Sequence, residues 1–177
     1  LFAAGLEALF TFIRTFVDER GFGSVGSFFL AYGGVAIVVR LATSSRIDRL
    51  RQLPLAVVAT TVFAVGLLGL GIASQAAHVT YAAVLLGAGH GLLFPVLTAQ
   101  VVTRARDAER GSAMAIFTSL FDLAVLTAAP IVGAVIDWQG YTTAFVGVGV
   151  LVAVGVAGYG VWEYRIAAAA SEATVTR

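Results

Sequence analysis

The sequence predicts an all-α membrane protein built as a bundle of six transmembrane helices. Hydrophobic residues make up 59% of the 177 residues and charged residues only 12%, and the mean hydropathy is +0.95. A water-soluble domain of this size cannot hide so much apolar surface. The apolar residues also fall into six runs, each close to the roughly 20 residues that a helix needs to cross the hydrocarbon core. A soluble enzyme, a nucleic-acid-binding protein and a disordered chain are therefore excluded.

The predicted spans follow one another through short connections. The first, about 1–17, is interrupted by Glu7 and Arg14, and the second, about 22–41, carries only Arg40 near its end. Strands of a closed membrane barrel would alternate polar and apolar residues, which these runs do not. The remaining spans cover about 55–74, 79–102, 111–136 and 141–162, and they are followed by a polar cytoplasmic tail at 163–177.

The arginines orient the predicted bundle. The chain has no lysine, and nine of its eleven arginines lie in or beside the second and fourth connections or in the tail. The positive-inside rule places these segments, and both ends of the chain, in the cytoplasm. We therefore expect an integral membrane protein of a bacterial cytoplasmic (inner) membrane. The absence of cysteine removes thiolate metal sites and disulfides, and we expect no cofactor and no bound metal.

Four ionisable residues interrupt the first, fourth and fifth spans, although an ionised side chain at mid-bilayer costs about 2.5–3.5 kcal/mol to insert. Asp122, eleven residues into the fifth span, is a candidate for proton or substrate coupling, or else a hydrogen-bonded carboxyl that locks helices together. Arg14 either pairs with Asp18 near the outer end or lines a cavity as a cation. Glu7 is a candidate for the same cavity. His90 either relays protons or is a neutral ring bonded to a neighbouring helix.

Small residues and prolines predict close packing and bends in the fourth and fifth spans. Gly87 and Gly91 form a small-xxx-small pair that lets another helix approach closely. Pro95 and Pro130 each remove a backbone hydrogen bond and are expected to kink their helices. Gly133 belongs to the same group of packing and kink positions.

Four segments also match patterns of one family. Residues 40–51 are similar to a cytoplasmic G-x-x-x-D-R-x-G-R loop, and residues 87–95 to a glycine-rich helix that ends in Phe-Pro. Residues 109–114 are similar to an Arg-Gly-x-Ala-Met helix start, and residues 121–133 to Asp-x-Gly followed by Gly-Pro-x-x-Gly. In this order, the segments resemble the C-terminal half, helices seven to twelve, of a major facilitator superfamily transporter, particularly its drug- and sugar-efflux members.

The resemblance implies one half of a twelve-helix secondary transporter that works by alternating access. Helices seven and ten would line a midplane cavity, eight and eleven would face an N-terminal six-helix half, and nine and twelve would face lipid. The implied function is proton-coupled efflux of a small organic molecule, and the partners are the bilayer, the N-terminal half, the substrate and protons. Because the chain begins at Leu1 rather than Met, we expect the N-terminal half to be a missing upstream part.

The resemblance also assigns roles to charged residues. Asp122, His90, Arg14 and Glu7 become candidates for handling substrate or protons. A cytoplasmic charge cluster would steady one of the two transport states, unless it serves only to set the topology. The members of that cluster are Arg40, Arg46, Asp48, Arg49, Glu109 and Arg110.

Two other classes of function stay open at this stage. The chain could be a membrane scaffold that does not transport, or a truncated remnant of a transporter. An intramembrane hydrolase could use Ser119 and His90, but the sequence contains no nucleophile elbow and no metal-ligand spacing. We therefore expect a protein that is not an enzyme.

Overall fold

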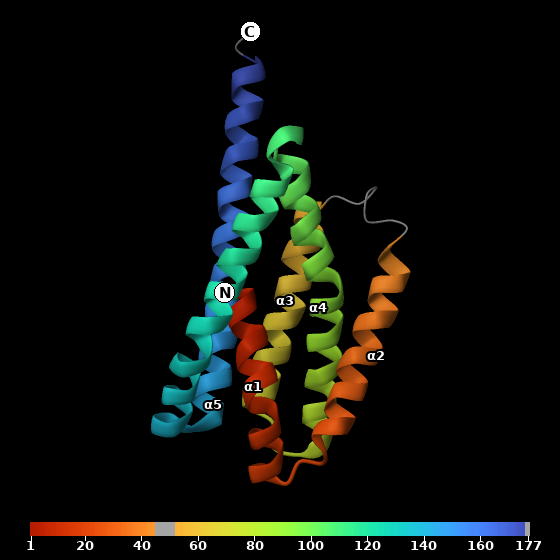
Figure 1. Cartoon of the computed structure of the whole chain (residues 1–177), viewed down its shortest axis with the longest axis vertical. Helices are drawn as coiled ribbons and strands as arrows, with labels where there is room; N and C mark the ends of the chain where they lie inside the picture. Colours follow the sequence, from red (N-terminus) through yellow and green to blue (C-terminus); the bar gives the residue numbers. More distant parts are fainter. Residues whose placement is uncertain (45–51, 176–177) are drawn as a thin grey trace.

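The computed structural model describes residues 1–44 and 52–175, with side chains for residues 1–43 and 52–165, and these residues contain helices but no strand. Helix α5 contains a single non-helical residue, Gly140 (φ 83°, ψ 169°), which divides it into a first arm (residues 110–139) and a second arm (residues 141–175) that turns back alongside it (Figure 1). The predicted all-α, six-helix bundle is therefore confirmed. The elements are α1 (Phe2–Arg20), α2 (Val25–Ser44), α3 (Gln52–Gly71), α4 (Ala76–Arg104), the 3-10 helix η1 (Asp107–Glu109) and α5 (Arg110–Val175).

Four segments are long and apolar enough to cross a membrane. Helix α1 is not among them because it carries five charged residues in 19. The last of the four segments is 59 residues long and contains both arms of α5, which the turn at Gly140 separates. The four segments are Val25–Thr43, Gln52–Gly71, Ala76–Arg104 and Asp107–Arg165.

The helices extend beyond the predicted spans at several ends. Helix α4 begins at Ala76 and ends at Arg104, and the second arm of α5 continues through the expected tail to Val175. A helix satisfies its own backbone hydrogen bonds, so it continues outside the hydrocarbon layer without penalty. Both α4 and the first arm of α5 also run through their prolines, Pro95 and Pro130, without an interruption.

The packing is uneven across the bundle. Helix α4 packs extensively against α2 and α3, while α1 and α3 pack against α5, and α1 barely touches α2. Figure 1 shows α1 at the front, with the first arm of α5 on one side and α4, and beyond it α2, on the other. The core beneath α1 is formed by large buried side chains such as Phe16, Phe63, Leu67 and Phe145.

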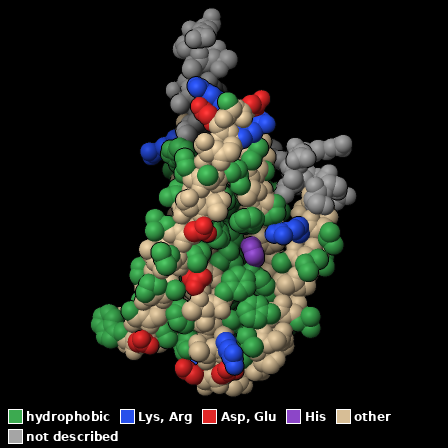
Figure 2. All heavy atoms as spheres, viewed as in Figure 1, with side chains coloured by type: hydrophobic (Ala, Val, Ile, Leu, Met, Phe, Trp, Pro, Cys, Tyr) green, Lys and Arg blue, Asp and Glu red, His purple; other side chains and the backbone are tan. Residues whose placement is uncertain are grey.

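The two ends of the bundle differ in charge. Helices α2 and α4 end, and α3 and α5 begin, at the end that we call the arginine-rich end, where ion pairs cluster between α4 and α5 (Figures 1 and 2). The opposite end contains the turn at Gly140 and the end of α1. There Tyr141 donates a hydrogen bond to Glu19 (3.3 Å) and Arg20 donates one to Thr142 (3.3 Å), so the end of α1 is tied to the turn.

Candidate substrate and proton site

A polar stripe runs along the open side of α1. Glu7, Thr11, Arg14 and Asp18 recur at intervals of three or four residues, which places them on one face of the helix. Thr11 donates a hydrogen bond to the Glu7 carboxylate, and Arg14 lies 3.8 Å from Asp18 in an ion pair whose two side chains are exposed. The structure therefore contains the Arg14–Asp18 pair that the spacing suggested, near the end of α1. Glu7 lies a helical turn or more nearer the middle of the bundle.

Asp122 lies on the open side of the first arm of α5. The residue is exposed, and no described side chain forms a hydrogen bond or ion pair with it. Eleven residues later on the same helical face, Gly133 packs against the Phe12 ring of α1, so this face is directed toward α1. The neighbouring Phe121 contacts the rings of Phe2 in α1 and Phe94 in α4. Asp122 is thus a free carboxylate at the edge of the seam between α1 and α5.

His90 is held between α1 and α2. Its Nδ1 atom forms a short hydrogen bond with the Tyr32 hydroxyl of α2, and the two rings lie 5.7 Å apart in a stacked arrangement. The Phe2 ring of α1 is 5.9 Å away on another side. His90 of α4 is thus a ring that is hydrogen-bonded to a neighbouring helix. Arg40 follows about two helical turns after Tyr32 on α2.

Glycines in α4 fix the contact between α2 and α4. A Cβ atom at Gly87 would overlap the Tyr32 carbonyl oxygen, and one at Gly91 would lie 2.6 Å from the Ala36 carbonyl oxygen. The predicted small-xxx-small pair therefore forms a close helix contact. On the other side of α4, a Cβ at Gly89 would lie 2.7 Å from the Phe63 side chain of α3. Helix α4 is packed tightly on both sides.

The predicted polar candidates are arranged around one open face. Figure 2 shows acidic side chains, a histidine and an arginine on this face, about halfway along the molecule, with hydrophobic side chains between them. The acids Glu7 and Asp122 belong to α1 and α5, whereas His90 and Arg40 belong to α4 and α2. Arg14 is farther toward the opposite end, beside Asp18. One face thus combines two acids with a separate basic and aromatic region.

The predicted cytoplasmic cluster is only partly described. Arg110 pairs with Asp107 (2.9 Å) and Glu109 pairs with Arg106 (3.8 Å), both within the turn that joins α4 to α5. Both are local pairs of three-residue spacing on the surface. Arg40 lies in the last turns of α2, toward the arginine-rich end. Three members of the cluster, Arg46, Asp48 and Arg49, lie outside the described residues.

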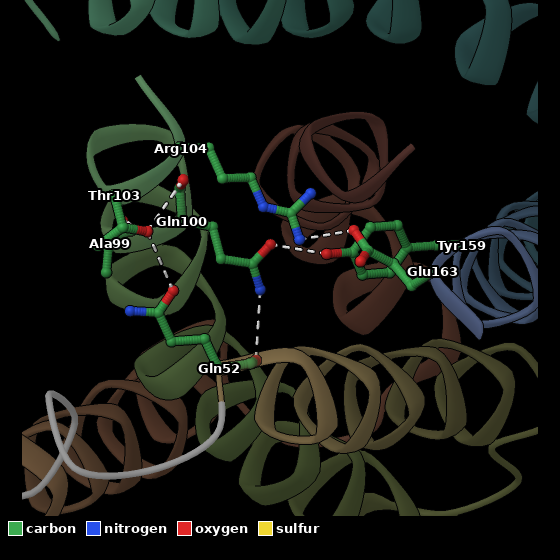
Figure 3. Close-up of polar contacts among 7 residues, drawn as sticks. All are labelled: Gln52, Ala99, Gln100, Thr103, Arg104, Tyr159 and Glu163. Carbon is green, nitrogen blue, oxygen red and sulfur yellow. Dashed lines mark hydrogen bonds and ion pairs between the residues drawn. The ribbon is translucent and has the colours of Figure 1, made fainter. Parts of the chain in front are cut away.

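A buried polar network at the arginine-rich end was missed by sequence reasoning. Gln100 of α4 donates to the Gln52 carbonyl oxygen at the start of α3 (3.3 Å) and accepts from the Tyr159 hydroxyl of α5 (2.7 Å). One turn later, Arg104 pairs with Glu163 at 2.6 Å, and the Glu163 side chain is only 12% exposed (Figure 3). The network joins the ends of α3, α4 and the second arm of α5. Glu163 was assigned to a tail, so its partner on α4 could not be anticipated.

Tyr32 was also missed, because a tyrosine within an apolar run is ordinary in a membrane helix. Only the register between α2 and α4 brings its hydroxyl to His90. Ser119, the residue considered for hydrolase chemistry, is exposed on α5, and His90 is bonded to Tyr32 rather than to a described serine. Within residues 1–43 and 52–165, no three His, Asp or Glu side chains converge on a possible metal position.

Comparisons with known proteins agree with the fold. The family model described as Major Facilitator Superfamily matches residues 1–174. The chain is 29% identical over 154 residues to the MFS-type transporter YhhS of Escherichia coli (strain K12). This match covers 87% of this chain and 38% of that protein. It is 31% identical over 154 residues to the Salmonella typhimurium (strain LT2) protein of the same name, with 86% and 38% covered. The chain thus spans well under half the length of these curated relatives.

Proposed function

The chain belongs to the Major Facilitator Superfamily, and on that premise we propose that it is the C-terminal half of a proton-coupled exporter of small organic molecules. In this proposal, α1 and α4 line the midplane cavity, and α2 and the first arm of α5 face an N-terminal half. Both facing helices expose many large hydrophobic side chains that a second half would cover. These are Leu30, Ile37, Val38 and Leu41 on α2, and Ile116, Leu120, Leu123, Leu126 and Ile131 on α5.

The single observation that carries the proposal is the open polar face itself. Asp122 has no partner among the described residues, and Glu7 is bonded only within α1, so neither acid locks two described helices together. Polar groups that serve only packing are expected to be satisfied by a neighbour. Carboxylates left open in the middle of a membrane protein are instead available to water, protons or substrate.

Proton coupling follows from exposing such an acid alternately to water and to an apolar contact. When the two halves close over the face, Asp122 loses water, and the neutral acid becomes favoured over the carboxylate. When the face reopens to the other side, water returns and the proton leaves. Transport of substrate in the opposite direction is then driven by the proton gradient, and the chain's own acids supply the coupling.

The test is transport by the full-length transporter that carries this chain, reconstituted in proteoliposomes. Three labelled solutes cover the charge classes: tetraphenylphosphonium, glucose and benzoate. We expect at least one to be accumulated when a pH gradient is imposed. The Asp122→Asn variant should lose this accumulation but keep solute exchange at equal pH, because the cavity remains while the proton carrier is gone.

Asp137→Asn is the matched control, because Asp137 is an exposed carboxylate in the last turn of the same arm of α5. It should accumulate solute as the unmodified protein does. Full gradient-driven accumulation by Asp122→Asn would remove Asp122 from the mechanism. No gradient-driven movement of any of the three solutes by the unmodified protein would overturn the proposed function.

A further inference from the structure

We propose that Tyr32, His90 and Arg40 form a preformed subsite on α2 and α4 that binds the carboxylate of an aromatic organic acid. This inference rests on the proposed function, because it names the chemical class of the transported molecule. The subsite lies on the α2 and α4 side of the open face, whereas the acids Glu7 and Asp122 lie on the α1 and α5 side. The charged guanidinium and a ring N–H would bind the carboxylate of the ligand, and neighbouring aromatic side chains would contact its ring.

In this proposal the Tyr32 hydroxyl is the donor to His90 and so sets the position of the imidazole proton. Tyr32 is only 5% exposed, and its hydroxyl meets the Nδ1 atom of the imidazole. With the phenol as donor, Nδ1 is the acceptor and the ring carries its proton on Nε2. His90 itself is only half-buried, and the proposal assigns its Nε2–H group as the donor to the bound anion. Tyr32 is therefore a positioning residue that acts through His90.

Packing holds this arrangement still. The α2 backbone at Tyr32 and Ala36 lies directly on Gly87 and Gly91 of α4, with no room for a Cβ atom between them. Helices that approach so closely cannot slide without breaking the contact. The subsite is consequently formed before the ligand arrives, which reduces the ordering cost of binding.

Arg40 supplies the positive charge. It is exposed on α2, one helical turn beyond Ala36, whose backbone packs on Gly91 beside His90. No described acidic side chain pairs with its guanidinium; the described pairs of the bundle involve other arginines. An arginine that no described carboxylate pairs with favours a planar, bidentate anion such as a carboxylate.

An aromatic platform lies beside the charged group. The Phe10 ring of α1 is stacked on Phe29 at 5.7 Å and meets Tyr32 edge-on at 5.6 Å. Phe10 is 45% exposed, so one of its faces remains uncovered on the open side of the bundle. A ligand ring could therefore lie on Phe10 while its carboxylate meets Arg40 and His90. The acids Glu7 and Asp122, on α1 and α5, would repel the carboxylate from the other half of the face.

The experiment measures binding of benzoate and of benzamide to the detergent-solubilised full-length transporter by the rise in its unfolding temperature. The two probes have the same ring and size, but only benzoate is an anion. We expect benzoate to stabilise the protein and benzamide to stabilise it far less. Equal stabilisation by both, or by neither, overturns the proposal.

Substitutions at three residues locate the binding. Arg40→Gln should weaken benzoate binding about tenfold or more, and Tyr32→Phe, which keeps the buried ring, should weaken it less. His90→Gln, which keeps an N–H donor, should bind better than His90→Phe. Arg165→Gln is the control, because Arg165 is an exposed arginine far along α5, and it should bind benzoate normally. Unchanged benzoate affinity in Arg40→Gln and Tyr32→Phe overturns the subsite.

An anionic lipid headgroup offers the same charge, so the benzoate titration is repeated with phosphatidylglycerol added to the micelle. An unchanged affinity supports a soluble carboxylate as the ligand, and strong competition assigns the subsite to lipid and overturns the proposal. Failure of this subsite is distinguishable from failure of the proposed function. Gradient-driven transport that ignores Arg40→Gln contradicts only the subsite, whereas benzoate binding without any gradient-driven transport contradicts only the exporter.

Discussion

The two sides of the open face are built in opposite ways. On the side of α2 and α4, glycines bring the backbones into contact, and Tyr32 and His90 form a hydrogen bond between the two helices. On the side of α1 and the first arm of α5, α1 is bonded only within itself along its stripe, and Asp122 has no described partner. The first side is closely packed and bonded between its helices, and the second is open and acidic.

This difference assigns separate tasks to the two sides. A preformed group of donors recognises a ligand at low entropic cost, so the α2–α4 side is suited to recognition. A carboxylate free to gain and lose water responds to a change of state, so the α1–α5 side is suited to coupling. One half of a transporter would thus keep substrate recognition and proton handling on different helix pairs.

The largest expected effect comes from loosening the closely packed side. Gly87→Ala places a methyl group against the Tyr32 backbone, which cannot move aside as a flexible side chain could. We expect a loss of about 3 kcal/mol or more of stability, at the upper end of overpacking costs. The measurement is the unfolding temperature of the solubilised full-length transporter. Gly69→Ala, which meets no atom within 4 Å, is the control and should unfold as the unmodified protein does. Equal unfolding temperatures for the two variants would show that the α2–α4 contact is not tight.

A smaller effect is expected from the network at the arginine-rich end. Glu163→Gln removes the charge that meets Arg104 at 2.6 Å while keeping the shape of the side chain. Because Glu163 is largely buried, we expect a loss of about 1–2 kcal/mol. Glu109→Gln breaks the exposed 3.8 Å pair with Arg106 and should cost less than about 0.5 kcal/mol. Urea unfolding of the solubilised transporter measures the loss of stability in the two variants. Equal losses in Glu163→Gln and Glu109→Gln would contradict a structural role for the buried pair.

The smallest expected effect concerns the polar stripe of α1. Asp18→Asn removes an ion pair whose side chains are 78% and 63% exposed, so stability should change by less than about 0.5 kcal/mol. A second variant, Arg14→Gln, tests whether Arg14 also acts in the cavity. If Arg14 serves only Asp18, then Arg14→Gln should leave gradient-driven transport unchanged. A strong transport defect in Arg14→Gln alone would add Arg14 to the site.

The sequence predicted the helices well because hydrocarbon thickness sets a length that composition reveals directly. It also predicted the close approach at Gly87 and Gly91, since small residues spaced by four have one main use in membrane helices. It could not predict contacts between distant helices. The Tyr32–His90 bond depends on the register of α2 against α4, and the Arg104–Glu163 pair on a helix that continues past its expected end. Hydrophobic periodicity shows which face of a helix is buried. It does not show how far the helix is shifted along its axis relative to a neighbouring helix.

The charged residues show the same limit. Arg40 is predicted to belong to the cytoplasmic cluster because it ends an apolar run, and it lies in the last turns of α2. A long arginine side chain can extend more than a helical turn from its Cα atom, so the position of its charge is not given by its place in the chain. Asp122 has a short arm, and its place on the open face was easier to anticipate.

Thiol accessibility tests most directly whether the open face is a wet cavity. The chain contains no cysteine, so single cysteines can be placed at Thr11 and Thr118 on the polar sides of α1 and α5, and at Val58 and Val154 on exposed apolar positions of α3 and the second arm. A membrane-impermeant thiol reagent is applied to the full-length transporter in sealed vesicles. A wet cavity predicts rapid labelling at Thr11→Cys and Thr118→Cys and none at Val58→Cys and Val154→Cys. Protection of all four positions, or labelling of the two valine positions alone, would contradict the transporter cavity.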